Sequence, residues 1–96
     1  MSDLRDSSGR LTFEFGRIDA GMYSQITKSV VSQFNLEALG QEIVGPDVVF
    51  QDFRRGEDVV GLEWDNWSGY IVNAKAESAE PLVREIASYV SVRFNS

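Results

Sequence analysis

The stretch that most constrains this chain is a β-hairpin predicted over residues 59–74. Apolar side chains alternate along both of its arms, first Val60, Leu62 and Trp64, then Tyr70, Val72 and Ala74. A short loop at residues 66–68 sets Trp64 opposite Tyr70, which places both apolar sets on one face. We therefore expect a sheet with this face packed on a core.

The spacing of apolar residues predicts two more strands and two helices. Residues 11–15 alternate between apolar and polar, and residues 48–54 are apolar on both faces, as in a strand inside a sheet. Residues 20–35 and 78–94 repeat apolar side chains at spacings of three and four, which is typical of amphipathic helices. Residues 36–46 show no clear period and receive no assignment.

Together these elements predict a single α+β domain over residues 11–96. The expected architecture is a two-layer sandwich in the order β-α-β-β-β-α, with a four-stranded, mainly antiparallel sheet and two helices on one face. Residues 1–10 are expected to form a flexible N-terminal tail, because Leu4 is their only large apolar side chain after Met1. The second face of the sheet is left to solvent or to a partner.

The chain contains no histidine and no cysteine. This absence excludes histidine-assisted nucleophiles, thiol nucleophiles, disulfides and zinc-thiolate sites. The glycines are isolated and form no phosphate-binding loop, and the acidic residues do not follow the spacing of a calcium loop. We therefore expect no enzyme activity, no cofactor and no metal.

Charge and hydropathy limit the partners. With 15 acidic and 9 basic residues, the net charge of −6 argues against nucleic-acid binding. The sequence has neither a signal peptide nor a stretch of about 20 apolar residues, so we expect a cytoplasmic protein with no membrane partner.

The candidate interface lies on the hairpin. Trp67 sits at the loop tip, and Ile71 and Val59 fall on the face opposite the core, with Glu63 and Asp65 beside them. The first hypothesis is therefore a non-enzymatic protein-interaction module, with a homodimer through the open sheet face as one form of it.

A second hypothesis is an inhibitor or immunity-type protein that masks a basic toxin or nuclease. In being small, acidic, cysteine-free and α+β, the chain resembles many bacterial toxin-neutralising proteins. This hypothesis requires one contiguous acidic face. The carboxylates that would form it are Asp52, Glu57, Asp58, Glu63 and Asp65.

A third hypothesis, a small-ligand carrier or an enzyme, needs a pocket. So short a chain is expected to have no apolar cavity of about several hundred Å³ between its sheet and its helices. A cavity lined by Tyr23, Trp64 or Tyr89 would favour this hypothesis over the other two.

Overall fold

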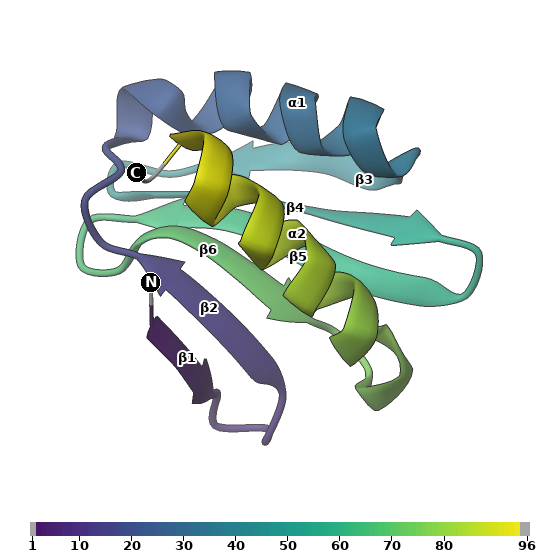
Figure 1. The fold of residues 1–96 in the computed structure, drawn as a ribbon. Helices are drawn as coiled ribbons and strands as arrows, with labels where there is room; N and C mark the ends of the chain where they lie inside the picture. The colour runs from purple at the N-terminus through teal and green to yellow at the C-terminus, as the bar shows by residue number, and fades with distance from the viewer. Residues whose placement is uncertain (1, 95–96) are drawn as a thin grey trace.

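The computed structural model describes residues 2–94, which form one antiparallel sheet of six strands with two α-helices packed on it (Figure 1). The strands are β1 (Ser2–Arg5), β2 (Leu11–Phe15), β3 (Glu37–Val44), β4 (Val48–Arg55), β5 (Asp58–Asp65) and β6 (Gly69–Ala74). The helices are α1 (Tyr23–Phe34) and α2 (Glu80–Phe94), and each follows one turn of 3-10 helix, Ala20–Met22 and Glu77–Ala79. The strand order across the sheet is β1-β2-β6-β5-β4-β3.

The predicted hairpin is confirmed as β5 and β6, with Trp64 opposite Tyr70 and Leu62 opposite Val72. Its turn is held by the carboxylate of Asp65, which accepts the backbone N–H groups of Trp67 at 2.9 Å and Ser68 at 2.6 Å. The two strands occupy the middle of the sheet between β4 and β2.

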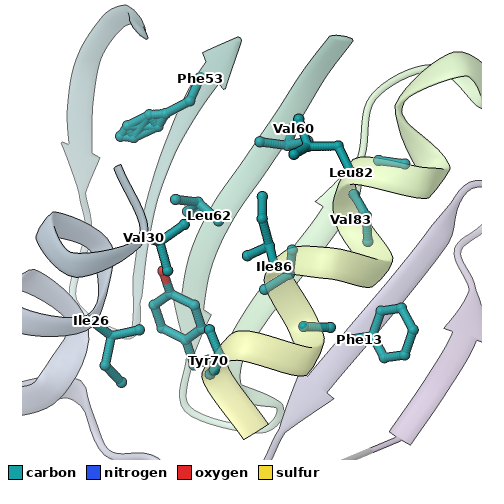
Figure 2. Close-up of a cluster of buried hydrophobic side chains, with 14 of the residues drawn as sticks. Phe13, Ile26, Val30, Phe53, Val60, Leu62, Tyr70, Leu82, Val83 and Ile86 are labelled. Atoms are coloured by element: carbon teal, nitrogen blue, oxygen red, sulfur yellow. The ribbon is translucent and has the colours of Figure 1, made fainter. Parts of the chain in front are cut away.

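The core lies between the sheet and the helices (Figure 2). Side chains from both arms of the hairpin meet those of α1 and α2 there. The fully buried members with the largest volumes are Tyr70, Phe15, Leu11, Ile26, Leu62, Leu82 and Ile86. Burial of each such side chain stabilises the fold by roughly 1.5 to 3 kcal/mol, so the inward face of the hairpin and α2 are principal contributors.

The α+β class is confirmed, but the predicted number of strands is wrong, because the sheet has six strands instead of four. One extra strand, β1, comes from residues expected to be a flexible tail. The carboxylate of Asp6 accepts the backbone N–H groups of Ser8 and Arg10, both at 2.9 Å, and so closes the turn that folds β1 onto β2. Arg5 also forms an ion pair with Glu80 at the start of α2.

The other extra strand, β3, occupies the segment that received no assignment from sequence. Its register on β4 shifts between Leu39 and Ile43, and Gly40 adopts a left-handed φ of 78° at this bulge. Its apolar residues stand in adjacent pairs, Ala38-Leu39 and Ile43-Val44, which face opposite sides of the sheet and so show no period of two. The observed order is therefore β-β-α-β-β-β-β-α.

Candidate functional site

The five predicted interface residues do not form one exposed apolar patch. Trp67 is 80% exposed at the tip of the β5–β6 turn. Ile71 does lie on the face opposite the helices, but it is only 7% exposed, since it sits between Glu14 on β2 and Glu63 on β5. Val59 is half-buried on the same face, and Asp65 is engaged in the turn.

Exposed apolar side chains gather instead at the β3 end of the sheet. Within residues 2–94, seven large hydrophobic side chains are exposed, and four of them belong to β3 and β4. Ile43 lies directly opposite Phe50, and Leu39 lies on the same outer face, where no helix covers the sheet (Figure 1). We call Leu39, Ile43 and Phe50 the β3 patch. Val44 is 67% exposed at the end of the same strand and points to the helix side.

Strand β3 is also an edge of the sheet. It pairs with β4 on one side and with no strand within residues 2–94 on the other. All eight of its residues are exposed. An edge strand with free backbone N–H and C=O groups and apolar side chains on both faces can add another strand.

The five carboxylates proposed as an acidic face are divided by the fold. Asp58 and Asp65 stand at opposite ends of β5, and Glu57 lies in the turn before it. Glu63 and Asp52 lie 3.1 and 3.9 Å from the ammonium group of Lys75. Asp52, Glu63 and Asp65 share the outer face of the sheet, but Lys75 lies beside two of them, so the five carboxylates do not form one unpaired acidic surface.

A groove of about 340 Å³ lies between α1 and the inner face of β3 and β4. This groove is open to solvent along one side, so it differs from the enclosed apolar cavity that so short a chain was expected to lack. Tyr23 and Val31 of α1 line one wall, and Ala38 and Phe53 line the floor. The groove stays open because the side chain of Ala38 is too small to fill it, and the nearby side chain of Gln51 is polar.

Two polar side chains that line the groove, Tyr23 and Gln51, are hydrogen-bonded within the protein. The Tyr23 hydroxyl donates to the carbonyl of Leu62 at 2.5 Å, and the Gln51 amide nitrogen donates to the carbonyl of Gly40 at 3.1 Å. Burial raises the pKa of Tyr23 to about 12, so its hydroxyl stays protonated near neutral pH. The groove thus offers apolar surface, and its charged side chains, Lys28 and Glu42, are exposed.

A second depression of about 520 Å³ lies between α1 and α2, where Phe34 and Tyr89 line it together with Arg84 and Glu85. The Tyr89 hydroxyl is hydrogen-bonded to Ser29 at 2.5 Å. Its floor is the edge-to-face contact of the Phe34 and Tyr89 rings, which is a packing contact between the two helices.

Residues 2–94 contain no cluster of three or more acidic side chains arranged to hold a metal ion. Every buried side-chain nitrogen or oxygen in this part of the chain has a hydrogen-bond partner. No helix in it is long and apolar enough to span a membrane. The surface features that stand out are therefore the β3 edge and the groove beside it.

Comparison of the chain with protein-family models, with curated proteins and with solved structures found no match. What the protein does must therefore follow from its own surfaces.

Proposed function

We propose that this protein is a non-enzymatic protein-interaction domain that associates with a second copy of itself through the β3 end of its sheet. The observation that carries the proposal is strand β3, an eight-residue edge strand whose residues are all exposed. A strand on the surface of a monomer is usually short, charged or covered, since its free edge otherwise recruits another chain.

The β3 patch adds apolar area on the outer face of this edge. Ile43 is 51% exposed and packs beside Phe50, which is 38% exposed. Contacts of this kind form the buried centre of homodimer interfaces. A small ligand in the groove would leave the patch uncovered, because the patch lies on the opposite face of the sheet.

Light scattering after size-exclusion chromatography tests the proposal. We expect the mass to rise from that of one 10.8 kDa chain toward twice that value as concentration increases from about 1 μM to about 1 mM. Ile43→Lys should raise the dissociation constant at least about tenfold, because it places a charge in the apolar centre of the contact.

Val92→Lys is the matched control. Val92 is 77% exposed on α2, so the same charge is introduced at a comparably exposed apolar residue away from β3. A strict monomer up to about 1 mM would overturn self-association. An equal effect of both substitutions would show that the contact does not involve β3.

The groove supports a second candidate function, binding of a small apolar ligand. Its volume of about 340 Å³ is at the lower end for small-molecule sites, which span roughly 300 to 1,000 Å³. Because the Tyr23 hydroxyl and the Gln51 amide nitrogen are already bonded, the ligand would have an apolar body. Of the two charged residues that line the groove, Lys28 suits an anionic end and Glu42 opposes it. A medium-chain fatty acid such as decanoate has this chemistry.

Titration with decanoate followed by NMR tests the second candidate. Amide shifts should concentrate at Thr27, Val31 and Ala38, and Ala38→Phe should abolish them by filling the groove. Val92→Phe, which adds the same ring on exposed α2, should leave them unchanged. Shifts spread over the whole surface, or their persistence in Ala38→Phe, would exclude the groove as the site.

A further inference from the structure

We infer that two copies pair their β3 strands antiparallel about a two-fold axis that passes beside Gln41. This inference rests on the proposed self-association and specifies its geometry. A strand that pairs with its own copy about a two-fold axis brings the same surface of both copies together and closes the assembly at a dimer.

The faces of the sheet restrict the register. Along β3, Ala38 and Val44 point to the helix side, because they lie opposite Phe53 and Val49 on the inner face of β4. Leu39 lies on the outer face, as does Ile43. Side chains directly opposite one another in an antiparallel pair share a face, so only registers that match inner with inner residues are allowed.

Centred on Gln41, the pairing matches every apolar side chain of β3 with another. Leu39 lies opposite Ile43 of the second copy, and Ala38 lies opposite Val44 of the second copy, each twice by symmetry. The acidic residues meet glycine: Glu37 falls opposite Gly45, and Glu42 falls opposite Gly40. No like charges stand directly opposite each other, which would be destabilising.

The neighbouring allowed registers are worse. With the centre at Gly40, Leu39 would lie opposite Gln41, and Ile43 would lie opposite Glu37. Both outer-face apolar residues would then face a polar side chain. Moving the centre to Glu42 would set the two Glu42 carboxylates against each other. The sequence of β3 thus selects one register of the three.

The bulge divides this pairing into two arms. Residues 37–39 of one copy pair with residues 43–45 of the other, and the bulge of each copy lies between the arms. The Gly40 carbonyl is already bonded to Gln51, which leaves it satisfied without a partner strand. On the outer face, the two β3 patches would join across the axis into one apolar surface.

Cysteine cross-linking tests the register, and the chain contains no native cysteine to compete. In the inferred pairing, residue 41 is the one position that lies opposite itself beside the two-fold axis, and a disulfide spans Cα atoms about 4.4 to 6.8 Å apart. Gln41→Cys should therefore give mostly covalent dimer under mild oxidation. Glu57→Cys, in the exposed β4–β5 turn, should give little.

A second cross-link does not depend on the conformation of the bulge. An equimolar mixture of Leu39→Cys and Ile43→Cys chains should form the mixed disulfide in preference to either symmetric one. Dimers by light scattering without preferential cross-linking in either experiment would overturn the register and leave self-association standing. A monomer by light scattering would overturn the proposed function itself.

Discussion

At the scale of single residues, Gly69 shows how closely the hairpin is fitted into the sheet. Gly69 begins β6 with a left-handed φ of 73°, and a Cβ atom built on it would lie 2.1 Å from the carbonyl oxygen of Phe15 on β2. Gly56, in the β4–β5 turn, has a similar φ of 63° but open space around it. Substitution of Gly56 therefore tests the cost of the left-handed backbone alone, whereas substitution of Gly69 adds the cost of the close approach to β2.

Alanine at these two glycines should have unequal effects on the free energy of unfolding. Gly56→Ala should cost about 1 to 2 kcal/mol, the penalty of a left-handed conformation for a residue with a Cβ atom. Gly69→Ala should cost more than about 3 kcal/mol, because β6 must also move away from β2. Denaturant unfolding of both variants measures the difference, and equal losses would contradict the close approach.

At the scale of elements, α1 is held on the sheet by hydroxyl groups as well as by apolar contact. Thr27 of α1 is hydrogen-bonded to the Tyr70 hydroxyl at 2.9 Å, and Tyr23 reaches the Leu62 carbonyl. The two tyrosine rings lie 5.7 Å apart. Burial raises the pKa of Tyr70 far above its ordinary value and that of Tyr23 to about 12.

Alkaline pH should therefore weaken the fold. A folded-state pKa above the unfolded value of about 10 gives stability that is complete below pH 10 and is lost as pH rises further. Tyr70 alone should lower the free energy of unfolding by about 1.4 kcal/mol per pH unit above that point. Denaturant unfolding at a series of pH values measures this slope.

Tyr70→Phe is the control for the alkaline slope. At neutral pH it should cost about 1 to 3 kcal/mol, because it leaves the buried Thr27 hydroxyl without its partner. Above pH 10 its stability should fall less steeply than that of the unaltered protein. Identical slopes would show that Tyr70 does not titrate with unfolding.

The elements also show what the sequence can predict. The hairpin and both helices follow from regular spacing of apolar residues, which records which side faces the core. Strand β3 was not predicted because its apolar residues stand in adjacent pairs that face both sides of the sheet, so they show no period of two. Strand β1 was not predicted because its residues are mostly polar and depend on a turn closed by Asp6. The Asp-Ser-Ser-Gly run at residues 6–9 is a turn signal and is the clue to β1 in the sequence.

The burial of Ile71 shows a related limit of the sequence. The alternation of side chains along the strand placed Ile71 on the correct face of the sheet. Whether a side chain on that face is buried depends on its neighbours on adjacent strands. Glu14 comes from β2, far away in sequence, and strand order cannot be read from hydrophobic period. The β3 patch was not predicted, because strand β3, which carries two of its three residues, was not predicted.

At the scale of the whole molecule, the sheet is wider than the helix layer. Six strands at their usual spacing span about 24 Å, whereas two adjacent helices cover about 20 Å. Helix α2 lies over β2 and β6, and α1 contacts β5 and runs beside β3 and β4, where the groove separates it from the sheet (Figure 1). The groove and the exposed edge strand are thus two results of one mismatch in width.

The opposite edge of the sheet limits how far association can proceed. Once β3 is joined to its copy, the two outer edges of the combined sheet are both β1, a strand of only four residues with Asp3 and Arg5 among them. Short, charged edges resist further strand addition. In the proposed dimer this edge would end growth, so we expect concentrated solutions to contain dimers without fibrils.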